Sequence, residues 1–251
     1  MTQRFKLIIE YEGTQFCGWQ TQRGGGAVQD ALSEAVFKFC GEEVNVNGAG
    51  RTDTGVHARG QVAHLDIEKS TDASTLLKAL NFHLKPHPVA VLSAQLVDNE
   101  FDARFSALRR HYEYRILSRR VRPTLMVERV WWVPVELDVA AMQEASVRLT
   151  GRHDFTTFRS AHCQAASPER SLDRLDVVAV DYGSHSKTGL RLLFGLEGRE
   201  INTIRDGLVH DLEARGRLAR RASKIGVKPV LIACGAAQAP MRLQSEERRI
   251  F

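Results

Sequence analysis

The chain has 251 residues, of which 43% are hydrophobic and 26% are charged, and its mean hydropathy is -0.26. These values are typical of a globular protein with enough chain for one large domain or two modest ones. They exclude a fibrous protein, a mini-protein and an intrinsically disordered chain. The formal net charge of +5 suggests an anionic partner but is too small to identify nucleic acid on its own.

The cysteines and the N-terminal stretch indicate the compartment. No two cysteines have the C-x-x-C spacing of a compact zinc site, and their scatter does not suggest a disulfide framework, so a reducing compartment fits best. The first residues enter a strand-like stretch without the regions of a signal peptide, and no apolar run approaches the ~18 residues of a membrane span. We therefore expect a cytoplasmic protein with no membrane partner. The cysteines are Cys17, Cys40, Cys163 and Cys234.

In the first part of the chain, apolar periodicity predicts alternating strands and helices. Glycines at 48, 50 and 55 mark a loop between two of the strands. The expected elements are a strand over 5–11, a helix from Val28 that stops at Gly41, a short strand over 44–46, a strand over 61–67, and a helix over 74–84 capped by Asp72 or Ser74.

The second part of the chain shows a similar order of patterns. We expect strands over 89–97, 112–117 and 129–135, a helix over 138–149 that ends at Gly151, and a strand over 170–180. This order predicts an α+β fold, made of two α/β subdomains with antiparallel or mixed sheets packed by helices. No internal repeat is strong enough to prove the duplication.

The most informative stretch is residues 48–64, G-A-G-R-T-D-T-G-V-H-A-R-G-Q-V-A-H. Its glycines permit tight backbone turns, so residues 51–53 are expected on a rigid loop between two strands. The plainest interpretation is an Asx turn with a surface ion pair. A phosphate-binding loop is disfavoured, because no Gly-Lys-Ser/Thr follows and no helix begins here. A metal site is disfavoured because His57 and His64, seven residues apart, point to opposite faces of a strand.

Residues 51–58, R-T-D-T-G-V-H-A, closely resemble the catalytic loop of the tRNA pseudouridine synthase A family, which usually reads R-T-D-A-G-V-H-A. The one departure is Thr54 in place of alanine. Further stretches resemble the family in the same order, and the resemblance covers about residues 4–180. These stretches are Tyr11 to Gly13, Phe16 to Gln20, Val28-Gln29, Leu80-Asn81, F-D-A-R-F-S-A-L-R-R-H-Y-E-Y at 101–114, and G-R-H-D-F-T-T-F at 151–158.

The resemblance implies a pseudouridine synthase-like fold and an isomerase without cofactor or metal. Its substrate would be tRNA, at uridines 38 to 40 of the anticodon stem and loop, and the protein would be a homodimer. Pseudouridine formation detaches uracil from ribose, turns it and rejoins it through C5, which requires a positioned nucleophile or charge stabiliser. By resemblance that group is Asp53, which would attack either the ribose C1′ or the uracil ring. Arg51 would displace the target nucleotide from its stack.

The resemblance also assigns Tyr112, in the R-R-x-Y-x-Y stretch, to the active site, where its ring would stack on the extruded base. Without the resemblance, a tyrosine packed in the core would be the simpler interpretation. Tyr114 lies two residues on and faces the same side, so only the motif position favours Tyr112. Residues 104–129 contain eight arginines and two glutamates, and interleaved aromatic residues make this segment a candidate RNA groove. The arginines are Arg104, Arg109, Arg110, Arg115, Arg119, Arg120, Arg122 and Arg129.

Beyond about residue 182 the family pattern disappears. The family has an F-L-x-x-x-V-R-x-x-V-G helix here, whose arginine pairs with the catalytic aspartate, and then a C-G-x-x-A-P ending. Ile204-Arg205 and Cys234-Gly235 are only two-residue echoes of it, and we assign them no role. Either an altered reading frame or divergence explains the change. Residues 208–221 could form a basic helix, and 183–251 carry an excess of six positive charges, which leaves 1–182 nearly neutral.

We therefore expect an N-terminal subdomain over 1–104 with the catalytic loop at 48–58, an RNA-binding subdomain over 105–182, and an atypical basic segment over 183–251. If that segment is foreign to the family, Asp53 lacks its arginine partner and turnover is reduced. The alternative function is then a non-catalytic RNA-binding protein derived from the family. A metal-dependent hydrolase is a distant third, opposed by the spacing of the histidines and the scattered cysteines.

Overall fold

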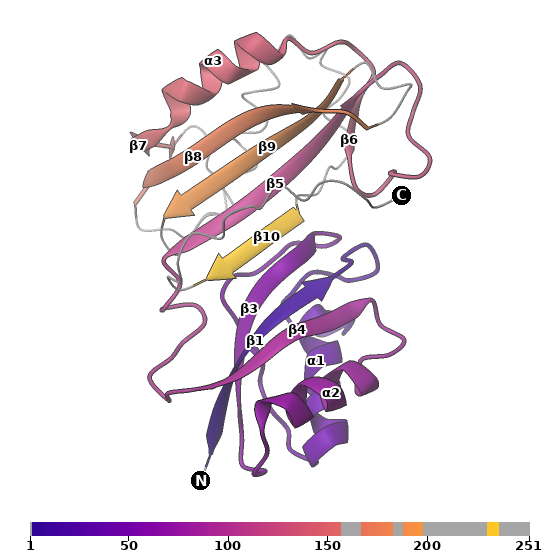
Figure 1. The fold of residues 1–251 in the computed structure, drawn as a ribbon, viewed down its shortest axis with the longest axis vertical. Coiled ribbons are helices and arrows are strands. Elements are labelled where there is room, and N and C mark those ends of the chain that lie inside the picture. The colour runs from indigo at the N-terminus through magenta and orange to yellow at the C-terminus, as the bar shows by residue number, and fades with distance from the viewer. Residues whose placement is uncertain (1, 157–166, 183–187, 198–229, 236–251) are drawn as a thin grey trace.

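The computed structural model describes residues 2–156, 167–182, 188–197 and 230–235. In these residues a single mixed sheet runs through the molecule, in the order β4-β1-β3-β10-β5-β9-β8-β7, with β2 paired to β3 and β6 to β5 (Figure 1). The strands are β1 (Gln3–Tyr11), β2 (Asn47–Gly48), β3 (His57–Ile67), β4 (Val89–Val97), β5 (Arg109–Ser118), β6 (Trp131–Val133), β7 (Gly151–Asp154), β8 (Glu169–Val180), β9 (Thr188–Glu197) and β10 (Val230–Gly235).

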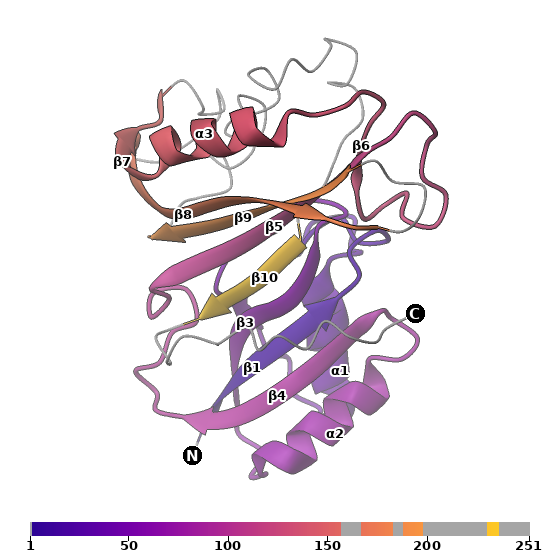
Figure 2. The same cartoon turned by 45° about the horizontal axis from the view of Figure 1, so that its top comes forward.

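Helices cover both halves of this sheet, which confirms the α+β fold class. In one half, α1 (Val28–Cys40) packs against α2 (Ala73–His83), and α2 packs against β4; in the other, α3 (Val139–Leu149) packs against β8 (Figures 1 and 2). The α2 helix is capped by Asp72, whose Oδ1 accepts hydrogen bonds from the backbone N–H groups of Ser74 and Thr75. Of the two caps that the sequence allowed, Asp72 is therefore the one used.

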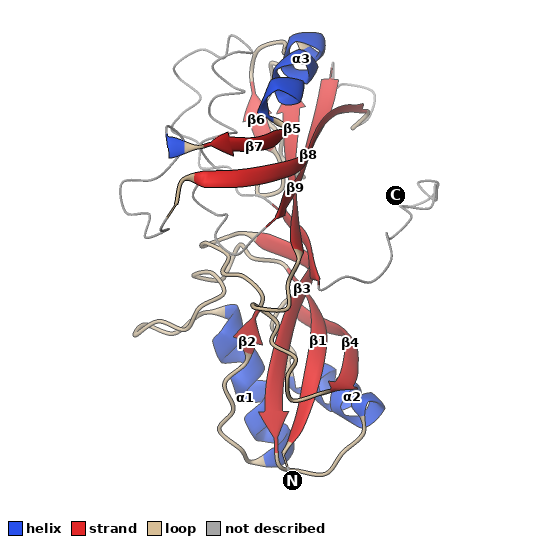
Figure 3. Ribbon diagram, turned by 90° about the vertical axis from the view of Figure 1, so that its left-hand side faces the viewer, coloured by secondary structure: helices blue, strands red, loops and turns tan. Residues whose placement is uncertain are grey.

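The alternation of β1 builds the core of the first half. Phe5, Leu7 and Ile9 are completely buried and belong to one apolar cluster with Val28 and Leu32 of α1. Burying each of these larger side chains contributes on the order of 1.5–3 kcal/mol, so this face of the sheet carries the core of the first half. The intervening residues of β1 point to the other face. Figure 3 shows α1 and α2 beside β1, β3 and β4, at the opposite end of the molecule from α3.

The two halves of the sheet meet at β10. This strand pairs in parallel with β3 and antiparallel with β5, so it stands between the two halves (Figures 1 and 2). It comes from the segment in which the family motifs fade, as does β9, which pairs with β5 and β8. The segment therefore supplies two strands of the sheet, whereas residues 204–205 and the predicted basic helix over 208–221 lie outside the described residues.

Some sequence-based boundaries are wrong. The short strand predicted over 44–46 is instead β2 at Asn47–Gly48, because the carbonyl of Val46 accepts a hydrogen bond from the buried side chain of Gln29 and forms no strand pairing. The strand expected over 129–135 is shortened to β6, and β7 was not predicted. The helix expected over 138–149 is confirmed as α3, but its C-cap is Thr150, and Gly151 is the first residue of β7. In the described part of the chain, no helix is both long and apolar enough to span a membrane.

Candidate active site

The loop between β2 and β3 presents Asp53 to solvent. Asp53 and Arg51 are both exposed, whereas Thr52 between them is buried. The Thr52 hydroxyl lies 2.8 Å from the hydroxyl of Tyr11, at the end of β1, and the N–H of Val56 donates to the Asp53 carbonyl at 3.1 Å. Because Thr52 is anchored against the core, its two neighbours are directed outward, and the carboxylate lies on a closed turn.

A neighbouring segment, residues 16–19, holds the loop by three hydrogen bonds. The N–H of Gly55 donates to the Phe16 carbonyl at 3.2 Å, and the N–H of Trp19 donates to the Thr52 carbonyl at 3.0 Å. The Thr54 hydroxyl donates to the Cys17 carbonyl at 3.0 Å. An alanine at position 54 could not make this third bond, so the departure from the usual family motif adds a contact to the loop.

Two glycines are required for this close packing. A Cβ on Gly18 would lie 2.5 Å from the Thr52 carbonyl oxygen, and the residue has a φ of +107°. A Cβ on Gly13 would lie 2.0 Å from the Val56 carbonyl oxygen. No side chain fits at either separation, which explains why the stretches 11–13 and 16–20 accompany the R-T-D motif in the sequence.

The start of α1 supports the same segment from the other side. The N–H groups of Val28 and Gln29, at the first turn of α1, donate to the carbonyls of Gly18 and Trp19 at 3.0 and 3.1 Å. N–H groups in the first turn of a helix have no acceptor within that helix, so these two hydrogen bonds supply their acceptors and also hold the segment in place. The loop that carries Asp53 is thus tied through residues 16–19 to a rigid helix.

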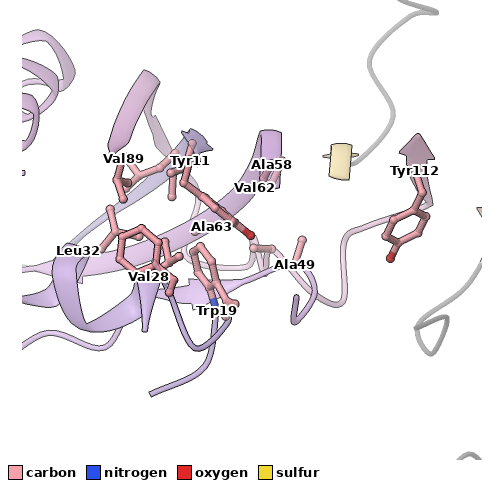
Figure 4. Close-up of a cluster of buried hydrophobic side chains, with 14 of the residues drawn as sticks. Tyr11, Trp19, Val28, Leu32, Ala49, Ala58, Val62, Ala63, Val89 and Tyr112 are labelled. Atoms are coloured by element: carbon pink, nitrogen blue, oxygen red, sulfur yellow. The ribbon is translucent and has the colours of Figure 1, made fainter. Parts of the chain in front are cut away.

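The register of the sheet places Tyr112 on the same face as this loop. Tyr11 is paired with Ala58, Ala58 with position 231 of β10, and position 231 with Tyr112. Paired residues point to the same face, so Tyr112 lies two strand spacings, about 10 Å, from Ala58 and on the side of Tyr11. Tyr11, Ala58 and Tyr112 belong to one core cluster, in which Figure 4 shows Tyr112 on its own strand, apart from the group around Tyr11. Tyr114 is off this row, since β10 pairs only with residues 109–113 of β5.

Arg110 has a structural role that the sequence did not indicate. Its side chain is 2% exposed, and Nη2 donates to the carbonyl of Ala49 at 2.7 Å, across β10. It shares the face of Tyr112, two residues on, and thereby confirms the register. The spacing in the sequence could have indicated that Arg110 is buried, because a residue two positions from a core tyrosine on a strand points into the same core.

The basic segment does not form one RNA-facing row, so this prediction is wrong for part of its length. Arg110 is buried, and Arg109 and Arg115 point to the opposite face from Tyr112. Arg109 pairs with Asp173 at 3.3 Å, and Arg115 pairs with Glu113 at 2.6 Å. Arg104, Arg109, Arg120, Arg122 and Arg129 are exposed.

The two histidines bind backbone groups. Nδ1 of His57 accepts from the N–H of Gly13 at 3.0 Å, so its other nitrogen, 2.9 Å from the Glu128 carbonyl, carries the proton in the neutral ring. His64 accepts from the N–H of Ala103 at 3.0 Å, and burial lowers its pKa. Within the described ranges, no group of three or more His, Cys, Asp or Glu residues is close enough to hold a metal ion.

Comparison with known proteins identifies the family of this chain. A family model described as tRNA pseudouridine synthase matches residues 7–106 and 145–232. The prediction that the family pattern disappears beyond residue 182 is therefore wrong, because the match continues into β10. The tRNA pseudouridine synthase A of Afipia carboxidovorans is 58% identical over 174 residues, which are 69% of this chain and 71% of that protein. The protein of the same name from a Bradyrhizobium species is 59% identical over 70% of this chain and 71% of its own.

A third relative extends the comparison. The tRNA pseudouridine synthase A of a Rhodopseudomonas palustris strain is 56% identical over 191 residues, which are 74% of this chain and 78% of that protein. The R-T-D-T-G-V-H-A loop, the segment that holds it and strand β3 lie in the stretches that the family model matches, whereas β5, which carries Tyr112, and β6 lie outside them. The chain belongs to the tRNA pseudouridine synthase family.

Proposed function

We propose that this chain converts uridine to pseudouridine in tRNA, at positions 38 to 40 of the anticodon stem and loop. In this isomerisation the bond between ribose C1′ and uracil N1 breaks, and a bond between C1′ and C5 forms. The proton on C5 is lost and N1 gains one, so the reaction balances without cofactor or metal. The family membership supports the tRNA chemistry, and the motif resemblance supports the position in the tRNA.

The observation that carries the proposal is the exposed Asp53 carboxylate on a loop held by residues 16–19 and by the buried Thr52. A nucleophile or charge stabiliser must be held in one place relative to the substrate, because misplacement of a reacting group costs most of its effect. Either attack, on C1′ or on the uracil ring, is compatible with this placement.

Arg51 and Tyr112 have supporting roles in the proposal. Arg51 is exposed two residues from Asp53, so its guanidinium can contact the RNA backbone when the target nucleotide leaves its stack. Tyr112 lies on the same face, but only 2% of it is exposed. A base therefore reaches its ring only if the covering side chains move when tRNA binds.

We also propose that the protein acts in the cytoplasm as a homodimer. The cytoplasmic location is supported by bacterial relatives that are named as tRNA pseudouridine synthases. The family resemblance supports the dimer. Size-exclusion chromatography with light scattering tests the dimer directly.

The decisive experiment is a pseudouridine assay on an unmodified tRNA with the wild-type protein and Asp53→Asn. Asparagine keeps the size of the side chain but removes the charge and the nucleophile, so turnover should fall by at least about a thousandfold while tRNA binding survives. Asp98→Asn is the matched control, because Asp98 is also exposed in a turn but lies after β4.

Three results have distinct meanings. Loss of turnover in Asp53→Asn alone supports the proposal. Equal turnover in Asp53→Asn and wild type rules out Asp53 as the catalytic carboxylate. A wild-type protein that binds tRNA but forms no pseudouridine supports the alternative, a non-catalytic RNA-binding protein. Mapping the modified nucleotide tests positions 38 to 40.

A further inference from the structure

A line of side-chain hydrogen bonds leads from the core to Arg51. The Nε of Arg51 donates to Oε1 of Gln20 at 3.1 Å, and Nε2 of Gln20 donates to Oε1 of Gln29 at 3.0 Å. Nε2 of Gln29 donates in turn to the carbonyl of Val46 at 2.9 Å. Every donor points toward the core, so the three side chains form a relay with a single direction.

The orientation of the Gln29 amide is fixed by its partners. Its oxygen accepts from Gln20 Nε2 and from the N–H of Thr21, both at 3.0 Å. Its nitrogen donates to Asn45 Oδ1 at 2.8 Å as well as to Val46. The two N–H groups and both acceptor positions of the amide are used, and a flipped amide would place donors against donors. Gln29 is 4% exposed, so water does not offer an alternative set of partners.

Gln29, at the core end of this line of hydrogen bonds, is held by helix α1. Gln29 lies in the first turn of α1, and its own N–H donates to the Trp19 carbonyl. Gln20 follows Trp19 directly, so the segment that fixes the Asp53 loop also carries the group that contacts Arg51. The same segment therefore holds both the loop of Asp53 and the side chain that contacts Arg51.

We propose that Gln20 and Gln29 are positioning residues that act through Arg51, holding its guanidinium in the orientation needed to displace the target nucleotide. This inference rests on the proposed function of Arg51. The bond at Nε fixes the plane of the guanidinium, whose Nη1 and Nη2 carry its other four N–H donors. An arginine held in this way loses less rotamer freedom when it contacts RNA, which favours the contact.

The first test measures the position of the arginine without relying on activity. Gln20→Met keeps the length of the side chain but removes both its donor and its acceptor. In nuclear magnetic resonance of the full chain, with the Nε–H signal assigned through Arg51→Lys, the Arg51 Nε–H should be rigid in wild type and mobile in Gln20→Met. Gln22→Met is the matched control, because Gln22 lies on the same exposed segment and donates to the Cys17 carbonyl. A rigid Arg51 Nε–H in Gln20→Met overturns the proposal.

The second test measures function in a double-mutant cycle with Arg51→Ala, using single-turnover pseudouridine formation on tRNA. Gln20→Met should slow this step by roughly ten- to a hundredfold in the wild-type background, the size expected for a hydrogen bond to a charged group. It should slow it by less than about twofold in the Arg51→Ala background, because the residue it acts through is absent. Equal effects in both backgrounds overturn the proposal.

A conservative variant separates positioning from a general structural role. Gln20→Glu keeps an acceptor for Arg51 Nε but cannot donate to Gln29, so it should retain more of the rate than Gln20→Met. Equal losses in the two variants, or loss of the folded state in both, show that Gln20 serves the fold and overturn the proposal. If Arg51→Ala reacts as fast as wild type, the proposed function of Arg51 fails, and the resonance measurement still decides whether Gln20 positions it.

Discussion

Gly18 is the point at which the backbone of the supporting segment comes closest to the loop of Asp53. Its φ of +107° is a conformation that L side chains rarely adopt, and an added Cβ would stand 2.5 Å from the Thr52 carbonyl oxygen. The same Cβ would lie 3.2 Å from the carbonyl carbon of Asp53 and 3.3 Å from the nitrogen of Thr54. All three neighbours are backbone atoms, so they can give way only by moving the loop.

The cost of Gly18→Ala follows from these distances. The Thr52 carbonyl would have to retreat by about half an ångström to reach 3.0 Å, the shortest separation that real Cβ atoms show, and by 0.9 Å to reach ordinary contact at 3.4 Å. The strained φ costs on the order of 1–3 kcal/mol, and overpacking costs about 1–3 kcal/mol more. We expect the free energy of unfolding to fall by roughly 2–6 kcal/mol.

The displacement also affects chemistry, because a shift near 1 Å in a reacting group costs about a hundredfold in rate. Urea unfolding measures the first effect, and single-turnover pseudouridine formation, at a temperature where the variant is folded, measures the second. Gly24→Ala is the control, since a Cβ there has nothing within 4 Å. It should be neutral or slightly stabilising. Wild-type stability and rate in Gly18→Ala would refute the reasoning that the loop is held at this contact.

Two further predictions concern buried polar groups. Burial lowers the pKa of His64 in the folded protein, so as the pH falls the unfolded chain binds the proton first. The stability that the neutral His64 contributes should therefore be complete above pH 6.5, the ordinary pKa of histidine, and be lost as the pH falls toward the lowered pKa. His64→Asn keeps an acceptor for the Ala103 N–H and should flatten this dependence in urea unfolding between pH 7.5 and 5; an unchanged slope contradicts the assignment. Arg110→Met removes the donor to the Ala49 carbonyl and should lower the free energy of unfolding by about 1.5–3 kcal/mol, whereas unchanged stability would show that this bond contributes nothing.

The elements that the sequence predicts well are those whose signal is local. The alternation of β1 and the apolar stripe of α1 follow from which side chains can share a buried face, and both elements are found where expected. The failed strand at 44–46 shows the limit. Its apolar residues fit a strand, but its polar groups bond to Gln29, a partner that the local pattern does not contain.

The candidate site was predictable in part for the same reason. The exposed turn at Asp53 follows from a short glycine-rich loop, but the function of the motifs around it depends on contacts between distant segments. Gln20 lies between Gln29 and Arg51, and it contacts both only because α1 and the loop pack on the same segment. The arginine run does not form one row along β5, because alternate residues of that strand face opposite sides of the sheet, which charge counting ignores.

The strand β10 shows why the weakest part of the sequence signal matters for the site. It is the only strand between β3, which follows the Asp53 loop, and β5, which carries Tyr112, among the residues that the structure describes. Side chains alternate along a strand, so a slip of one residue between β10 and β5 would shift Tyr112 by about 3.4 Å along the sheet. It would also pair position 231 of β10 with a residue of β5 whose side chain points to the face opposite Ala58.

Contacts on both faces of the sheet hold that register. On the face of Tyr112, Arg110 reaches the Ala49 carbonyl across β10. On the opposite face, Arg59 of β3 approaches the buried carboxylate of Glu113 at 3.7 Å. A slip would separate both pairs and leave the buried Glu113 without one of its cations, which is costly for a desolvated charge. The relative position of Asp53 and Tyr112 is thus set by β10, which the C-terminal part of the chain supplies, together with two polar contacts that cross it.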